Sequence, residues 1–156
     1  MTARSSLGPR DWRLAVWRAF LRAHAEVLAS LERDLSSAVQ LPLAWYDVLL
    51  QLVETPDRRL RMAELADRVL LSRSGLTRLV DRLQREGLVT REPVPGDARG
   101  LYTVLTPAGF ARIRDASPVH LAGVNEYWVS RFTDGELREL AALLGKLTKE
   151  PVAEPG

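Results

Sequence analysis

The first third of the chain carries an apolar pattern with helical spacing. From Arg10 to about Ala38, apolar residues recur every three or four positions, which is the repeat of one face of an α-helix. A second apolar set lies beside the first, so the combined arc is wider than a one-sided surface helix needs. We therefore expect a long helix that is covered from two directions. The two sets are Trp12, Val16, Phe20, Ala23, Val27, Leu31, Leu35 and Leu14, Trp17, Leu21, Ala25, Leu28.

Three shorter helices are expected next. The stretch "LAWYDVLLQLVE" follows Pro42, which suits the first turn of a helix, and its nearly continuous apolar character predicts burial. The chain then turns, with a very short strand expected at residues 60–61 and a third helix in "MAELADRV". Ser72 is a good N-cap for a fourth helix, and Gly87 stands where a glycine would end it.

A hairpin follows the fourth helix. Two strands are expected at residues 88–92 and 101–105, on either side of the turn-forming stretch "PVPGDARG". Pro93 cannot donate a backbone hydrogen bond, which restricts the first strand to an edge or an end. The sequence therefore predicts a hairpin with a long tip that carries both acidic and basic residues.

Two more helices complete the pattern. A Thr-Pro pair at 106–107 is a strong start signal for a helix expected to run to about residue 132, with a kink or break at Pro118. The sequence "TDGE" at 133–136 fits a capping box at the start of the last helix. That helix is expected to end before a flexible tail at 151–156. The predicted fold class is mainly α with a small β-hairpin.

The fourth helix has two chemically different sides. At about 100° per residue, four aliphatic residues fall on one side, and hydroxyl and charged residues fall on the other. The aliphatic residues are Leu76, Leu79, Val80 and Leu83; the polar side comprises Ser74, Arg78, Asp81 and Arg85, flanked by Thr77 and Arg82. Helix N-termini can bind phosphate, and arginine can bind guanine edges in the major groove of DNA. This helix alone also fits an ordinary amphipathic helix with a solvated face.

Composition narrows the classes of function. The chain has 156 residues, typical of one domain, and its lack of cysteine excludes disulfides and thiolate metal sites. We find no metal-ligand spacing, nucleophile motif or glycine-rich phosphate loop, so we expect no enzyme, no catalytic residue, no cofactor and no metal site. We also find no signal-like or membrane-spanning apolar run, and we expect a cytoplasmic location without a membrane partner.

The net charge of +2 is unevenly distributed along the chain. Residues 58–99 carry a net charge of +4, whereas the segments before and after them carry −1 each. A local basic patch of this kind indicates a polyanionic partner, although an arginine-rich solvated surface has the same composition.

The hairpin changes the interpretation of the basic helix. A short helix at 63–68, a tight turn and the fourth helix have helix-turn-helix spacing, and a hairpin directly after them predicts a winged helix. Arg99, expected at the tip, suits the negative potential of a narrow minor groove. Asp97 cannot favour phosphate, so we expect it to orient Arg99 or another arginine. A plain turn residue with local hydrogen bonds is the alternative.

The stretch "LSRSGLTRLVDRLQREGLVTREPVPGDARGLYTVLTPAG" resembles the DNA-binding core of the MarR family of bacterial transcription regulators. The helix end "LVDRLQREGLV", the "D-x-R" of the wing and the following "LT-x-x-G" match in order, and the flanking helices extend the resemblance to residues 10–149. One departure is Ala98, where the family often has a second basic residue. The resemblance implies a winged helix-turn-helix core at about 42–106, flanked by dimerisation helices at about 10–38 and 107–149.

Membership of this family would imply a homodimer that binds double-stranded DNA sequence-specifically as a repressor. Two recognition helices about 34 Å apart would bind an inverted-repeat operator. The candidate DNA-binding residues are Ser72, Arg73, Ser74, Thr77, Arg78, Arg82, Arg85, Asp97 and Arg99. The candidate dimer-interface residues, some of which fit an intrachain core equally well, are Trp12, Val16, Phe20, Trp128, Phe132, Leu137, Leu140 and Leu144.

The resemblance further implies regulation by a small effector, often aromatic and anionic. The candidate effector-binding residues are Trp17, His24, Trp45 and Tyr46, although aromatic residues at such places are more often core. A bound effector would favour a spacing of the two DNA-binding lobes that does not match DNA, and so relieve repression. The alternative function is a winged helix used only for protein contact, which would not need a basic helix face.

Overall fold

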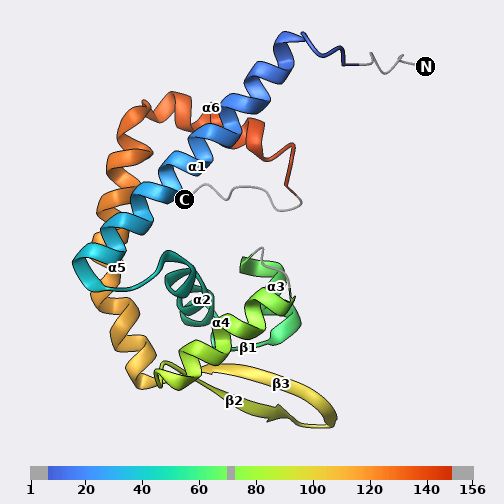
Figure 1. Cartoon of the computed structure of the whole chain (residues 1–156), viewed down its shortest axis with the longest axis vertical. Coiled ribbons are helices and arrows are strands. Elements are labelled where there is room, and N and C mark those ends of the chain that lie inside the picture. The colour runs from blue at the N-terminus through green and yellow to red at the C-terminus, as the bar shows by residue number, and fades with distance from the viewer. Residues whose placement is uncertain (1–6, 70–72, 149–156) are drawn as a thin grey trace. The chain divides into compact units, whose positions relative to one another are not determined.

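The structure is a computed structural model that describes residues 7–69 and 73–148. Figure 1 shows its helices and its single sheet. In chain order the elements are α1 (Trp12–Val39), α2 (Leu43–Val53), β1 (Arg59–Arg61), α3 (Met62–Val69), α4 (Arg73–Arg85), β2 (Val89–Val94), β3 (Asp97–Leu105), α5 (Pro107–Tyr127), the 3₁₀ helix η1 (Val129–Arg131) and α6 (Asp134–Leu144). The mainly α fold with a small β-hairpin is therefore confirmed.

The chain divides into two compact units. The sheet unit comprises Glu32–Ala122, and the stem unit comprises the chain up to Leu31 together with the chain from Gly123 onward. Helices α1 and α5 each run from one unit into the other.

The sheet unit contains nearly all of the core. Helices α2, α3 and α4 pack against the three-stranded sheet, and the short helix α3 lies between α2 and α4 in the packing order. The burial expected for α2 is confirmed. The core residues with no exposed surface include Leu35, Leu41, Val48, Leu49, Leu52, Leu65, Leu76, Val80, Leu83, Val89, Thr103 and Ala116.

The sheet is antiparallel, with strand order β1-β3-β2. Pro93 lies within β2, an edge strand, as its missing N–H group requires. The predicted long tip is wrong, because β3 begins at Asp97 and pairs with Val94 across a tight turn. Gly96, with φ of 79°, makes the turn, and a bulge between Pro93 and Val94 adjusts the register. Arg99 consequently lies on a strand near the tip and not in a loop.

Helix α5 differs from the prediction in two respects. Of the kink or break predicted at Pro118, the break does not occur, since the helix continues through Pro118. The helix also ends at Tyr127, before η1, instead of reaching residue 132. A proline inside a helix removes one backbone hydrogen bond, a loss that packing of the rest of the helix can outweigh. The Oγ of Ser117, next to the proline, donates to the carbonyl of Ile113 at 2.8 Å.

The capping predictions for α5, α6 and the end of α4 are confirmed, whereas the N-cap predicted at Ser72 lies outside the described residues. The Oγ1 of Thr133 accepts from the N–H of Glu136, whose carboxylate accepts from the N–H of Thr133, which is the reciprocal pattern of a capping box. At the start of α5, the Oγ1 of Thr106 accepts from the N–H of Gly109 at 3.0 Å. Gly87 has φ of 72°, the left-handed conformation expected where α4 ends.

The stem unit makes almost no core of its own. Within its described part, Leu31 and Gly123 alone are buried. Many large apolar side chains of this unit are exposed, so the wide apolar arc predicted on α1 is not covered in its first half. The exposed residues are Leu7, Trp12, Val16, Trp17, Phe20, Leu21, Leu28, Val129, Phe132, Leu143 and Leu147.

Candidate nucleic-acid interface

Helix α4 presents the two predicted faces. Leu76, Val80 and Leu83 have no exposed surface, whereas Leu79 is only half-buried. The hydroxyl and cationic residues of the other face are exposed: Ser74, Thr77, Arg78, Arg82 and Arg85. The helix therefore packs against the unit through one side and presents hydroxyls and guanidinium groups to solvent on the other.

The side chains of two candidate DNA-binding residues, Ser72 and Arg73, are not described by the structure. Ser72 lies outside the described residues, as does the predicted tail at 151–156, and Arg73 is placed only by its backbone at the start of α4. The role of the first turn of α4 in binding DNA stays a prediction.

An ion pair explains why an acidic residue lies among the cations of α4. Asp81 contacts Arg91 of β2, with Oδ1 and Nη1 2.7 Å apart, and the same nitrogen donates to the Oε1 of Gln84 at 3.1 Å. The pair ties α4 to the sheet and neutralises the Asp81 charge. Arg78 and Arg82 form no ion pair with any described residue, so their charge remains available to a ligand. Sequence reasoning did not single out Arg91, because its partner lies on another element.

The cations near the end of α4 also suit the helix electrostatically. Arg82 and Arg85 lie in the last turn, where the partial negative charge of the helix C-terminus favours a positive side chain.

The wing places its acidic and basic residues close together. Asp97 forms an ion pair with Arg61 of β1, with Oδ2 and Nη1 3.0 Å apart, and its Oδ1 accepts from the backbone N–H of Arg99 at 3.2 Å. Asp97 thus contacts another arginine and also makes local hydrogen bonds, so both predicted alternatives describe part of its geometry. The Arg99 side chain is exposed and forms no ion pair with a described residue.

Further arginines stack on aromatic rings in the same unit. The Cζ of Arg58 lies 4.2 Å from the ring centroid of Phe110, and the Cζ of Arg59 lies 4.8 Å from that of Tyr102. Sequence reasoning missed these arginines. For Arg59 the available signal was the alternation of Arg59, Leu60 and Arg61 on a strand, since it directs Arg59 and Arg61 away from the core.

The four effector candidates are divided between the two units of the chain. Tyr46 is a core residue, only 2% exposed, and its ring stacks on that of His120 with centroids 4.2 Å apart. Burial lowers the pKa of His120, because it disfavours the charged form of the imidazole. Trp17 and His24 belong to the stem unit, whereas Trp45 and Tyr46 belong to the sheet unit.

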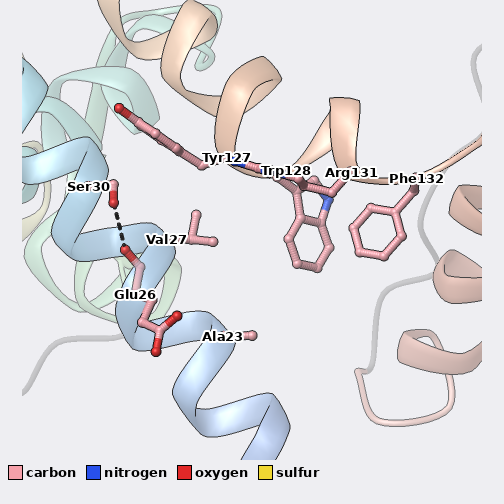
Figure 2. A pocket seen from close by; sticks show the side chains of 8 residues that line it. All are labelled: Ala23, Glu26, Val27, Ser30, Tyr127, Trp128, Arg131 and Phe132. Atoms are coloured by element: carbon pink, nitrogen blue, oxygen red, sulfur yellow. Dashed lines mark hydrogen bonds between the residues drawn. The ribbon is translucent and has the colours of Figure 1, made fainter.

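The stem unit has a hollow of about 370 Å³ between α1 and the end of α5, shown in Figure 2. Trp128 and Phe132 form an aromatic wall, with ring centroids 5.3 Å apart, and Arg131 and Glu26 supply charge. None of the four effector candidates lines it. The complete lining is Ala23, Glu26, Val27, Ser30, Tyr127, Trp128, Arg131 and Phe132.

Two other classes of site are not found in the part of the chain that the structure describes. No three side chains of the metal-ligating types gather there to hold an ion. None of its helices combines the length and apolar character that crossing a membrane requires.

A basic helix packed on a short helix and followed by a hairpin defines a winged helix-turn-helix protein. A model of the MarR family matches residues 39–100. In the crystal structure of Sco3205, a MarR family transcriptional regulator from Streptomyces coelicolor in complex with DNA, the matching chain is 31% identical. The match has a TM-score of 0.84 and covers 94% of this chain and 91% of that chain. The chain therefore belongs to the MarR family of transcription regulators.

Two relatives known by sequence agree. The HTH-type transcriptional regulator PecS of Dickeya dadantii is 32% identical over 90 residues, which are 58% of this chain and 54% of PecS. The HTH-type transcriptional repressor YetL of Bacillus subtilis is 30% identical over 102 residues, which are 65% of this chain and 60% of YetL. The matched region thus spans little more than half the length of these two relatives.

Proposed function

We propose that the protein represses transcription by binding an inverted-repeat operator in double-stranded DNA as a homodimer. The observation that carries the proposal is the exposed cationic face of α4, with Arg78, Arg82 and Arg85. On the opposite face of the same helix, Leu76, Val80 and Leu83 have no exposed surface. In the major groove these guanidinium groups would contact guanine edges and phosphates. Arg99 on the wing would enter the adjacent minor groove.

The homodimer is supported by the exposed apolar side chains of the stem unit. Trp12 is 74% exposed and Val16 is 59% exposed, and large apolar patches of this kind mark interaction surfaces. A second copy of the chain would cover them and place two copies of α4 about one DNA turn apart. Of the predicted interface residues, those on α6 are half-buried, namely Leu137, Leu140 and Leu144.

Repression is supported by the relatives. YetL is named a transcriptional repressor. The complex of Sco3205 with DNA supports DNA binding. A winged helix that binds only protein would not need three exposed arginines on one helix face. A regulator of this class acts on chromosomal DNA in the cytoplasm.

A small aromatic acid is the effector class that we propose. The stem hollow supports this class, because Trp128 and Phe132 offer ring faces and Arg131 offers a cation. An aromatic carboxylate such as salicylate should release the protein from its operator and raise its melting temperature. Release without such a rise would mean that the acid does not bind the folded protein and acts only as added salt.

The DNA-binding proposal is tested with a fragment of the promoter region of the protein's own gene. The affinity should fall steeply with salt, because the bound arginines release counterions from the phosphates. Arg78→Ala should weaken binding by about five- to a hundredfold, as expected for loss of a base or phosphate contact. Arg138→Ala, which removes an exposed arginine of α6, is the matched control and should bind like the parent. Equal binding by Arg78→Ala, Arg99→Ala and the parent would contradict the site assignment.

A further inference from the structure

One carboxylate in the wing joins elements that are far apart in sequence. The Oδ2 of Asp97, the first residue of β3, accepts from the Nη1 of Arg61, the last residue of β1, at 3.0 Å. The Oδ1 of Asp97 accepts from the backbone N–H groups of Arg99 at 3.2 Å and Gly100 at 3.0 Å. One carboxylate oxygen of Asp97 thus binds the side chain of Arg61, and the other binds the backbone at Arg99 and Gly100.

Residue 100 leaves room for this arrangement. A Cβ atom at Gly100 would overlap the carboxylate of Asp97, at 2.7 Å from its Cγ. Any larger residue would therefore displace the carboxylate from the position in which it accepts both backbone hydrogen bonds.

Arg61 is itself fixed to the helix-turn-helix. Its backbone N–H donates to the Oε2 of Glu64 in the first turn of α3 at 2.9 Å. On the neighbouring strand it pairs in register with Tyr102, and its Cζ lies 6.0 Å from the centroid of that ring. The contacts therefore run without interruption from the first helix of the helix-turn-helix to the backbone of Arg99.

We infer that Arg61 is a positioning residue for DNA binding, which together with Asp97 and Gly100 forms a latch that sets the direction of Arg99. This inference rests on the proposed function and identifies a residue that acts through Arg99 and not by contact with DNA. A wing held in its binding geometry loses less conformational freedom when the complex forms, and so binds more tightly. Without Arg61, Asp97 loses its charged partner, and the backbone at 99–100 becomes less restrained.

The test is a double-mutant cycle on the promoter fragment, with dissociation constants measured by fluorescence anisotropy. Arg99→Ala should weaken binding by about tenfold or more, as expected for loss of a direct contact. Arg61→Ala should weaken it by about fivefold, the usual size of coupling between neighbouring residues. If Arg61 acts through Arg99, the double variant should bind like Arg99→Ala alone, to within about twofold.

The matched control is Arg59→Ala. Arg59 lies on the same strand and over the same Tyr102 ring, but its carboxylate partner is Asp57, 4.0 Å away and outside the wing. This variant removes the same charge from the same strand without removing a partner of Asp97, so it should change the dissociation constant by less than about twofold. Melting temperatures of both variants establish that each is folded.

Amide hydrogen exchange in the free protein gives a second readout. The N–H groups of Arg99 and Gly100 both donate to Asp97. They should therefore exchange faster in Arg61→Ala than in the parent, whereas in Arg59→Ala they should exchange at the parent's rate. This measurement needs no DNA. If the parent protein fails to bind DNA, the proposed function is refuted, but hydrogen exchange still shows whether Arg61 restrains the backbone of Arg99 and Gly100.

Several outcomes would overturn the inference. Losses that multiply in the double variant would mean that Arg61 contacts DNA independently. Unchanged binding by Arg61→Ala, or an equal loss in Arg59→Ala, would mean that the ion pair does not position the wing. If Arg99→Ala binds DNA like the parent, Arg99 does not contact DNA and the inference fails. Weaker binding by Arg78→Ala would still support DNA binding through α4.

Discussion

Gly109 lies in the first turn of α5, against the chain that follows α4. Its N–H donates to the Oγ1 of Thr106, and that hydroxyl donates to the carbonyl of Gly87 at 2.7 Å. A Cβ atom on residue 109 would overlap the carbonyl oxygen of Leu88 and would lie 2.8 Å from the Cδ1 of Leu105. The absence of a side chain therefore permits the close approach of α5 to the end of α4.

Gly109→Ala should destabilise the protein despite the higher helix propensity of alanine. The overlap involves a backbone oxygen, which cannot move without disturbing the hydrogen bonds around it, so we expect a loss of about 1–3 kcal/mol in the free energy of unfolding. Urea denaturation measures this change.

Gly135→Ala is the control for this substitution. A Cβ atom there would meet nothing closer than the Oγ1 of Thr133, at 4.0 Å. Alanine in helix α6 should therefore be neutral or should stabilise by up to about 1 kcal/mol. A stabilising effect at both glycines would contradict the close approach at Gly109.

At the scale of the element, the buried side of α4 stabilises the fold, and its exposed side is the side that we expect to bind DNA. Leu83→Ala should lower the free energy of unfolding by about 2–5 kcal/mol, because Leu83 has no exposed surface and its truncation leaves a cavity. Arg82→Ala, one residue away on the exposed side, should change the free energy of unfolding by less than about 0.5 kcal/mol but weaken DNA binding. Urea titration and anisotropy of both variants check the separation. Similar losses of stability in both would mean that Arg82 takes part in packing.

The elements were predictable where their signals are local. The Thr-Pro pair at the start of α5 and the capping box of α6 place helix starts within a single turn of chain. Helix α2 is different, because Pro42 offers no capping side chain. The N–H of Leu43 instead donates to the Oε2 of Glu32 at 2.8 Å, from a residue on α1. No local pattern indicates that contact.

For the whole molecule, the central question is what covers the stem unit. If a second copy does so, Phe20→Glu should disrupt the dimer, since a charge buried in an apolar interface without a partner is strongly unfavourable. Sedimentation velocity at micromolar concentration should show a mass near two chains for the parent and near one chain for the variant. The variant should also lose binding to the inverted repeat, because one recognition helix alone contacts half of it.

Leu101→Glu is the control for the dimer. Leu101 is 42% exposed, similar to Phe20 at 45%, but lies on β3 of the sheet unit. This variant should sediment like the parent. A parent that sediments as one chain would refute the dimer and leave the apolar surface of α1 for another partner.

The amino-acid sequence alone determined the helical periodicities, the caps of α5 and α6, the glycine that ends α4 and the two faces of α4, because each depends on residues within a few positions of one another. It limited Pro93 to an edge or an end of a strand, and the order of the strands placed it on an edge. The tertiary structure alone decided that α5 continues through Pro118, that the wing is paired almost to its tip, and that Arg61 meets Asp97 and Arg91 meets Asp81. These features depend on contacts between different elements of the fold. Their free energy outweighs local preferences, and no pattern within a single element encodes them.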